Sequence, residues 1–471
     1  MSHCHLDRNP VFSDTFQRNL DAMVGLLEGG EKNPGAKLIG FELERILVDA
    51  ADRPLPYAGE NGVASILGAL AAMHPEDERV YIDGHLLGLD YKLEVAGERI
   101  GVTVSLEPAA QLEVSAGPAT NVRALYRAVE AFDAQLADVL KELEIDARLV
   151  AAGYDPFVEA PEDLELIPKE RYRDMDAYLS RHGRYARDMM RCSASTQVSL
   201  DYEDEADAMR LYRMGTLLGP LFAFLFDNAP VFRGKPTPGM ARSLIWHHVD
   251  VDRCGIVPGA LTGLTFEQYA LWVAGVKPIL FTDEQHVTSS TGSRYARDIM
   301  AERALTRSEL FHLLSMVFPN VRLKGFCEFR EMDSLPPRLA AACTSFTGAL
   351  FYDKCLENKL AARLSAWLPR GFEGVDEHDA VTARMHLEEH GWDAEIFGAP
   401  VTAVVDALVA IARENIEHDG ACTGLEVRDG AEATVPVVHG DDEARSFDLE
   451  GIDMLDTLWK KRTLPRNVLT L

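Results

Sequence analysis

The chain has 471 residues, 47% of them hydrophobic, enough to bury a core in one large domain or in about two to three ordinary ones. It carries 47 Lys and Arg against 75 Asp and Glu, which gives a formal net charge of −28 at pH 7. A surface this acidic repels nucleic acid and anionic membranes, so we expect neither as a partner.

The N-terminal residues and the cysteines indicate where the protein is located. The opening residues MSHCHLDRNP lack the apolar segment of a signal peptide, and the longest apolar run, 217–226, is too short to span a bilayer. The seven cysteines form no C-x-x-C pair, and we interpret Cys4 with its flanking histidines as part of a ragged terminus, not as a metal site. This pattern predicts reduced thiols and a cytoplasmic protein.

Four segments alternate apolar and polar residues with the period of a β-strand: residues 37–49, 102–115, 195–202 and 321–330. In each, one face is apolar and the other carries carboxylate, amide, hydroxyl or cationic side chains. If the four pair in one antiparallel sheet, their polar faces form a single surface. Glu and Asp are poor strand formers, and their mutual repulsion requires compensating cations, so the set favours a functional site.

The polar faces of the first three segments hold Glu42 and Glu44; then Gln111, Glu113 and Ser115, preceded by Glu107; and then Gln197, Ser199 and Asp201. The fourth segment, predicted as one strand, places Arg322, Lys324, Phe326, Glu328 and Arg330 on one face. A carboxylate can hold a hard cation such as Mg²⁺, and a guanidinium beside it can bind phosphate oxygens. For each segment taken alone, the alternative is an exposed strand with salt bridges.

Helical periodicity, capping residues and breakers predict the helices between these segments. In chain order they cover residues 13–28 with Ser13 as the N-cap, 62–73, 121–145, 176–191, 204–227 with a kink near Pro220, 265–275, 294–304 and 306–318. Residues 336–367 are predicted to be largely helical, as is much of 400–416. Strand-like pieces are expected over 80–100 and a long loop over 151–169. Residues 241–252 are predicted as a further strand, on which Arg242 suits a substrate carboxylate because its fork matches that group.

Nucleotide-binding motifs of the common kinds are missing from the sequence. It contains no G-x-G-x-x-G fingerprint, no G-x-x-x-x-G-K-[ST] loop and no G-x-S-x-G elbow. A Rossmann or P-loop nucleotide site is therefore disfavoured, and no internal repeat suggests a solenoid.

Several collinear motifs resemble the plant and proteobacterial class of glutamate–cysteine ligase. They are LEPAAQLEVSAGP (106–118), IPKERYRDMDAYL (167–179), MMRCSASTQVSLDY (189–202), ARSLIWHHVDVDRCG (241–255), TFEQY (265–269) and VRLKGFCEFREMD (321–333). The resemblance covers about residues 35–365, and little is recognised in the helical region of about 366–471. It implies an α+β fold similar to glutamine synthetase, in which helices back an antiparallel sheet with a polar concave catalytic face, in a single catalytic domain over 1–471.

The resemblance also implies the chemistry. In that family the γ-carboxylate of glutamate takes the γ-phosphoryl group of ATP, and the amine of cysteine attacks the acyl phosphate, the first step of glutathione-type thiol synthesis. ATP and Mg²⁺ are the implied cofactors, and the implied partners are small molecules only. Mg²⁺ and arginines would neutralise charge on the transferring group while the protein positions it.

The resemblance assigns roles position by position. The implied metal ligands are Glu42, Glu44, Glu107, Glu113 and Glu328. Glu328 and Arg330, which match the family's E-x-R, are the implied catalytic residues, with Arg330 and Gln111 beside the nucleotide. Arg242, Trp246, Gln197, Arg171 and Lys169 are the implied substrate-binding residues, and Arg242 is assigned to the glutamate α-carboxylate. Two departures are Ala109-Ala110 in place of Gly-Gly and Ser199 in place of Asn.

The sequence is also compatible with three other functions. A ligase of the same superfamily could join glutamate, or another carboxylate, to a different amine. A transferase similar to phosphagen kinases would form a stable phosphorylated product without a second acceptor. A non-enzymatic homologue would only bind nucleotide or a partner. The presence of five charged site residues argues against a homologue that has lost its activity: Glu42, Glu44, Glu113, Glu328 and Arg330. The sequence gives no oligomeric state.

Overall fold

A nine-stranded antiparallel sheet lies at the centre of the computed structural model, which describes residues 13–33, 35–285, 287–418 and 442–468. Its strands are β1 (Ile39–Asp49), β2 (Arg79–Ile82), β3 (His85–Val95), β4 (Glu98–Leu106), β5 (Leu112–Ala119), β6 (Ala147–Val150), β7 (Thr196–Leu200), β14 (Val321–Leu323) and β15 (Cys327–Phe329). The order is β14-β15-β7-β1-β5-β4-β3-β2, with β6 paired to β1. Short pairs outside this sheet are β8 (Val231–Phe232) with β9 (Lys235–Pro236), β10 (Cys254–Gly255) with β13 (Phe318–Pro319), β11 (Leu280–Thr282) with β12 (Thr288–Ser290), and β16 (Glu395–Ile396) with β17 (Ala399–Pro400).

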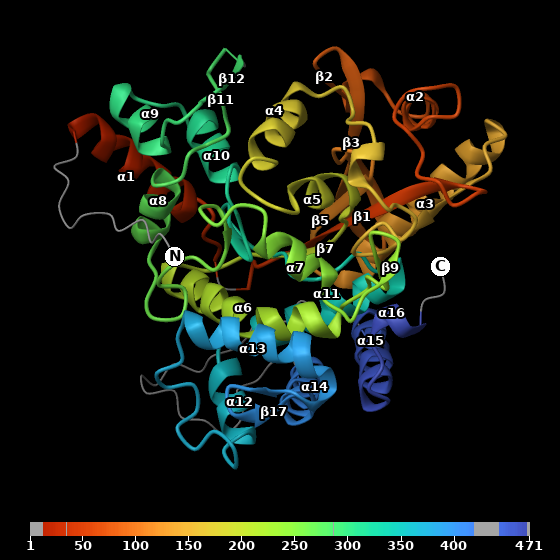
Figure 1. Ribbon diagram of the computed structural model, residues 1–471. Helices are drawn as coiled ribbons and strands as arrows, with labels where there is room; N and C mark the ends of the chain where they lie inside the picture. Colours follow the sequence, from red (N-terminus) through yellow and green to blue (C-terminus); the bar gives the residue numbers. More distant parts are fainter. Residues whose placement is uncertain (1–12, 34, 286, 419–441, 469–471) are drawn as a thin grey trace.

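The helices, in chain order, are α1 (Asp14–Glu28), α2 (Val63–Ala72), α3 (Val122–Glu142), α4 (Glu170–Leu179), α5 (Ala186–Cys192), α6 (Glu205–Leu225), α7 (Ala241–His247), α8 (Phe266–Ala274), α9 (Ala296–Glu302), α10 (Arg307–Ser315), α11 (Pro337–Phe351), α12 (Leu356–Arg363), α13 (Glu377–His390), α14 (Val401–Glu417), α15 (Asp442–Lys460) and α16 (Pro465–Val468). Most predicted helices are confirmed within a few residues. The predicted α+β class is confirmed, since helices and an antiparallel sheet form one mixed architecture (Figure 1).

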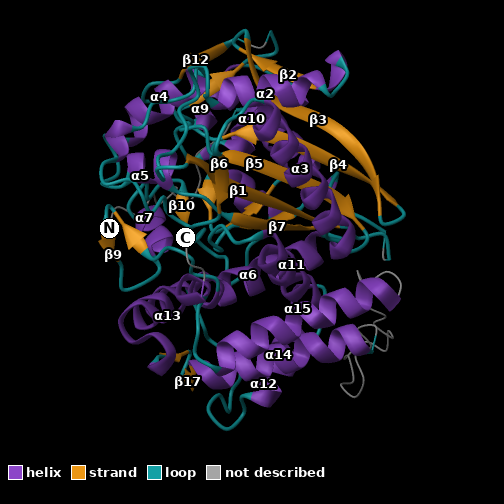
Figure 2. Ribbon diagram, turned by 90° about the vertical axis from the view of Figure 1, so that its right-hand side faces the viewer, coloured by secondary structure: helices purple, strands orange, loops and turns teal. Residues whose placement is uncertain are grey.

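All four predicted strand segments lie side by side in the central sheet. On β1 the odd positions Phe41 and Leu43 are buried in the apolar core, where α3 and α11 pack against the strands. The even positions therefore point to the other face, as period-two alternation requires. Figure 2 shows the strands fanning across the upper part of the molecule, with α11, α14 and α15 below them.

Two of the four segments are not single strands. Residues 102–115 divide into β4 and β5, which a turn at 107–111 connects. Residues 321–330, predicted as one strand, form a hairpin, because Gly325 adopts a φ of +89° that reverses the chain. The hairpin pairs Arg322 with Glu328, so these two side chains lie on one face of the sheet, as predicted.

Two further predictions were wrong. Residues 241–252, predicted as a strand, contain helix α7, whose buried positions Ala241, Arg242 and Ile245 follow helical spacing. A short apolar run of this kind fits both periods, and its tertiary contacts decide. The helix predicted over 176–191 is interrupted between α4 and α5, where Gly183 lies so close to the Val249 carbonyl that a Cβ atom would stand 1.9 Å from its oxygen.

The C-terminal helices pack on the rest of the chain, on the far side of α6 from the sheet in Figure 1. Helices α14 and α15 both contact α11, and from α16 the Arg466 guanidinium reaches Asp227 at 3.2 Å and the Thr237 carbonyl at 3.0 Å. Among the described residues, no helix has the length and apolar character needed to cross a membrane. The described cysteines, Cys192, Cys254, Cys327, Cys343 and Cys355, are free, whereas Cys4 and Cys422 lie outside the described residues.

Candidate active site

Three carboxylates meet at the centre of the polar face. The register of β1 and β5 places Glu44 directly opposite Glu113, and Glu107 follows the end of β4 in the turn that leads into β5. One oxygen from each of these three side chains lies within 4.8 Å of the others. We call Glu44, Glu107 and Glu113 the carboxylate trio.

Neutral donors orient two members of the trio, Glu44 and Glu113. Glu44 accepts hydrogen bonds from the Ser195 amide at 2.7 Å and from the Gln197 side-chain amide at 3.1 Å. Glu113 accepts from the Ser105 hydroxyl at 2.9 Å and the Ser115 hydroxyl at 3.3 Å. These bonds orient the oxygens but add no positive charge to balance the carboxylates.

The electrostatics of the trio call for a cation. Burial raises the pKa of Glu44, Glu107 and Glu113, and repulsion between the neighbouring carboxylates raises the pKa of Glu107 and Glu113 further. Like charges directly opposite on paired strands are destabilising. Oxygen ligands grouped in this way are the type that hard divalent cations bind, so the residues fit a magnesium site.

Glu328 is the centre of a second cluster of opposite character. Its side chain is fully buried and contacts the Arg322 Nε at 2.6 Å, the Lys324 Nζ at 2.9 Å and an Arg330 amino group at 3.0 Å. Burial alone would raise its pKa, but these three cations hold the pKa of Glu328 well below its usual range. One carboxylate among three cations leaves net positive charge, which suits phosphate oxygens. We call this group the cation cluster.

Glu42 lies between the two clusters. In the sheet it is paired with Ser115 on one side and Gln197 on the other. Burial, followed by the charges of Glu113 and Glu328, raises its pKa to about 8. Of the five predicted metal ligands, three thus form the trio, while Glu42 and Glu328 lie next to it along the same face. Their metal-binding roles stay predictions.

Gln111 braces the turn that carries Glu107. Its amide oxygen accepts from the Ala109 amide at 2.8 Å, and its amide nitrogen donates to the Met190 and Ser193 carbonyls, both at 3.3 Å. Ala110, in place of the glycine expected from the resemblance, adopts a left-handed φ of 68°. A non-glycine residue costs about 1–2 kcal/mol there, so the turn is strongly determined by its surroundings. The predicted nucleotide contact of Gln111 stays a prediction.

Lys169 and Arg171 approach the trio from the start of α4. The Lys169 ammonium lies 4.6 Å from the centre of the Tyr172 ring, and burial lowers the Lys169 pKa although Glu107 opposes the shift. Arg171 donates to the Met316 sulfur at 3.6 Å, and burial lowers the Arg171 pKa. Both cations are thus near the carboxylates, and their substrate roles stay predictions.

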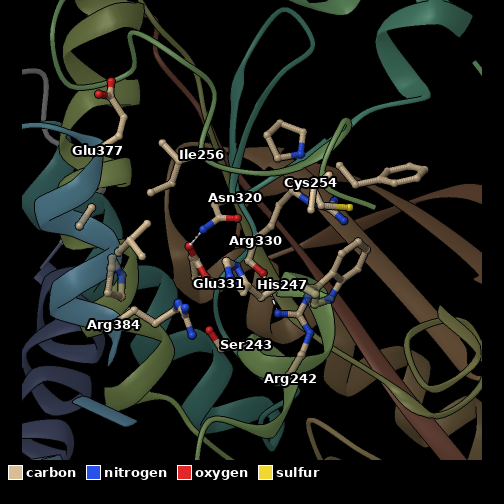
Figure 3. Close-up of a pocket in the computed structure, with 18 of the residues that line it drawn as sticks. Arg242, Ser243, His247, Cys254, Ile256, Asn320, Arg330, Glu331, Glu377 and Arg384 are labelled. Carbon is tan, nitrogen blue, oxygen red and sulfur yellow. Dashed lines mark hydrogen bonds between the residues drawn. The ribbon is translucent and has the colours of Figure 1, made fainter. Parts of the chain in front are cut away.

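A cavity of about 280 Å³ opens beside Arg330, lined on one side by Arg242, Trp246 and Arg330 (Figure 3). Arg242 is 4% exposed, donates to the Arg330 carbonyl at 2.8 Å and lies 5.8 Å from the Trp246 ring centre. The Arg242 Nε and the Trp246 Nε1 are buried without a hydrogen-bond partner in the part of the chain that the structure describes. Unsatisfied buried donors are costly, so a bound acceptor group is the expected partner.

Other residues at this site were not assigned a role from sequence. Arg322 and Lys324 were placed on the correct face, but their contact with Glu328 depends on the hairpin. Glu331 and Arg384, both in the cavity lining, were missed. A local signal existed for Glu331, which directly follows the E-x-R motif, but none for Arg384, which comes from α13.

Comparison with known proteins gives a consistent result. Residues 38–414 match the family model described as glutamate-cysteine ligase family 2. The chain is 28% identical over 407 residues to "Glutamate--cysteine ligase, chloroplastic" of Brassica juncea, covering 84% of this chain and 75% of that protein. It is 28% identical to the protein of the same name from Arabidopsis thaliana over 407 residues, 84% and 74% of the two chains. For the Medicago truncatula protein the identity is 29% over 408 residues, 84% and 76% of the two chains.

Proposed function

Because the chain belongs to glutamate-cysteine ligase family 2, we propose that it joins the γ-carboxylate of glutamate to the amine of cysteine in an ATP-dependent reaction. The observation that carries this proposal is the carboxylate trio lying next to the cation cluster on one polar sheet face. Such a pair of clusters suits a triphosphate that is bound partly through divalent cations and partly through guanidinium and ammonium groups.

We propose these roles for the residues of this chain. The Arg242 guanidinium, supported by Trp246, binds the α-carboxylate of glutamate and directs its γ-carboxylate toward Arg330. Arg330, with Glu328 behind it, contacts the transferring phosphoryl group and offsets its charge. Positioning of this kind supplies most of the rate enhancement in phosphoryl transfer, since the protein performs little covalent chemistry itself.

Mg²⁺ would be held by Glu44, Glu107 and Glu113, with Glu42 beside them. The mutual repulsion within the trio is relieved by a divalent cation, which is the reason these residues fit it. When bound, the ion neutralises negative charge on the phosphate groups. The hydroxyls of Ser105 and Ser115 then keep the carboxylate of Glu113 oriented.

The proposal extends to the fold, the domain organisation and the location. We propose a sheet of the glutamine synthetase type with its catalytic surface on the polar face, in a single catalytic domain over residues 1–471. The contacts of α14, α15 and α16 with the rest of the chain support one domain. A cytoplasmic location is proposed from the N-terminal sequence and the scattered cysteines; the plant relatives are named chloroplastic.

The decisive experiment measures ADP release and product mass with purified protein, ATP, Mg²⁺ and pairs of amino acids. We expect ADP release that requires both glutamate and cysteine, together with γ-glutamylcysteine in the mass spectrum. ADP formation that is indifferent to glutamate would refute the proposal. A strong preference for another amine at fixed glutamate would replace cysteine by that acceptor.

A further inference from the structure

Helix α16 brings one arginine, Arg466, to the segment that leads into α7. The family model matches residues 38–414, so α16 lies outside the matched part of the chain. Figure 1 shows α16 near β9, and just beyond that strand the Arg466 guanidinium donates to the carbonyls of Thr237 at 3.0 Å and Pro238 at 2.6 Å. The Arg466 Nε also lies 3.2 Å from a carboxylate oxygen of the fully buried Asp227. One C-terminal side chain thus holds two loop carbonyls and a buried acid.

Asp227 passes this contact on to the first residue of α7. The carboxylate oxygen that faces Arg466 also accepts a hydrogen bond from the Met240 amide at 2.9 Å. Met240 is the N-cap of α7 and has a left-handed φ of 51°, directly after Gly239 with a φ of +144°. Backbone of this kind persists only where its surroundings determine it. Arg242 follows two residues later, so the place of Asp227 fixes where the helix that carries Arg242 begins.

A row of charges also connects the C-terminal helix to Arg242. Asp333 is 3% exposed, and burial, followed by the charge of Asp227, raises its pKa to about 8, while Arg242 and Arg466 oppose the shift. Burial lowers the pKa of Arg242, and Asp333 is first among the charges that counter it. Two buried carboxylates therefore lie between two guanidinium groups, and each guanidinium compensates part of the same negative charge.

We propose that Arg466 is a positioning residue for the glutamate site, which acts through Asp227 on helix α7 and its Arg242. This inference rests on the proposed function, in which Arg242 binds the α-carboxylate of glutamate. Without the Arg466 guanidinium, the entry to α7 loses three contacts, and the negative charge of Asp227 and Asp333 is left to Arg242 alone. The Arg242 guanidinium is then drawn toward Asp333 and away from the cavity, so glutamate binds more weakly.

The test varies glutamate and ATP separately in the ADP-release assay at saturating cysteine. In Arg466→Ala we expect the glutamate KM to rise by about 5-fold to 20-fold, with the ATP KM and the kcat at saturating glutamate within about 2-fold of wild type. Arg466→Lys keeps a charge beside Asp227 but lacks the planar fork that serves both carbonyls, so its glutamate KM should rise by about 3-fold to 5-fold. This second variant decides the matter if the alanine variant does not fold.

A double-variant cycle shows whether Arg466 acts through Arg242. Arg242→Lys weakens the glutamate contact directly, so little remains for Arg466 to position. The glutamate KM of Arg242→Lys/Arg466→Ala should therefore lie within about 2-fold of that of Arg242→Lys alone. Two independent effects would instead multiply.

The control is Arg462→Ala, four residues earlier, which removes an exposed ion pair with Asp393 and should keep the wild-type KM values. An unchanged glutamate KM in Arg466→Ala, or in Arg466→Lys where the alanine variant does not fold, would overturn the positioning role. So would an ATP KM that rises as much as the glutamate KM, or a double variant whose KM is the product of the two single effects. Absence of glutamate-dependent ADP release in the wild-type protein would instead overturn the proposed function.

Discussion

The carboxylate trio and the cation cluster predict opposite effects for the same chemical change. Glu328→Gln removes the one negative charge that faces Arg322, Lys324 and Arg330, and it leaves three largely buried cations without compensation. Glu113→Gln removes one of several mutually repelling carboxylates. In the metal-free protein we therefore expect Glu328→Gln to lower stability and Glu113→Gln to raise it.

The magnitudes follow from the contacts. Removing one partner of a buried ion pair typically costs about 3–5 kcal/mol. Two charges at the 4.8 Å limit of the trio repel by about 3 kcal/mol at an effective dielectric constant of about 20, so relief of about 1–3 kcal/mol is expected for Glu113→Gln. With an unfolding entropy of about 2.1 cal/mol/K per residue, a chain of 471 residues changes its Tm by about 1 °C per kcal/mol.

The assay is thermal unfolding at pH 8.5 in the presence of a chelator. We expect the Tm of Glu328→Gln to fall by about 3–5 °C and that of Glu113→Gln to rise by about 1–3 °C. Glu267→Gln, on the exposed first turn of α8, serves as the surface control and should stay within about 0.5 °C. Both variants should lose ligase activity, so activity alone cannot distinguish them. Equal losses of stability in Glu328→Gln and Glu113→Gln would refute the assignment of two clusters with opposite charge.

Three further predictions concern pH, the glutamate contact and the hairpin. Because the pKa of Glu42 is raised from 4.5 to about 8, its contribution to stability is present below pH 4.5 and is lost as the pH rises toward 8. The Tm measured in the presence of a chelator should therefore fall between pH 4.5 and pH 8. A Tm that rises across this interval would contradict the shift. Arg242→Lys should raise the glutamate KM by about 10-fold to 100-fold with the ATP KM unchanged, because a lysine cannot form the bidentate contact, and steady-state kinetics with varied glutamate measure it. Gly30→Ala should lower the Tm by several degrees and reduce activity, because the new Cβ would lie 2.2 Å from the carbonyl oxygen of Gly325 in the hairpin turn. The control is Gly68→Ala in a helix, where a Cβ meets nothing within 4 Å, and it should be neutral or stabilising.

The polar face of the sheet could be predicted from sequence because alternation reports burial directly. Phe41 and Leu43 pack into the core, so Glu42 and Glu44 must face the other way whatever their neighbours are. In residues 321–330 the side chains lie on the predicted faces, although the segment is a hairpin and not the single strand that was predicted. A three-residue turn at 324–326 pairs even-numbered residues with even-numbered residues, as Arg322 with Glu328, so their side chains share a face in a hairpin as they would in one strand.

The contacts between charges depend on register, which alternation does not contain. Glu44 meets Glu113 only in the register that β1 adopts with β5, which shifts between Ile39 and Phe41, and Glu107 joins them through the turn that connects β4 to β5. The α13 residues that line the cavity beside Arg330 were beyond prediction for a related reason. Arg384 and Arg330 are far apart in sequence, and nothing in the helical pattern of α13 indicates which face packs against a cavity and which against solvent.

Gln197 shows how the two clusters depend on each other. It lies on β7, between β1 and β15, and its amide nitrogen donates to Glu44 of the trio while its amide oxygen accepts from Arg330 of the cation cluster at 2.5 Å. A carboxylate at this position would repel Glu44, and an aliphatic side chain would release Arg330. An amide of this length satisfies both contacts at once because it offers a donor and an acceptor in fixed orientation. The polar face is therefore one connected network, in which the position of the acidic side chains constrains the position of the basic ones.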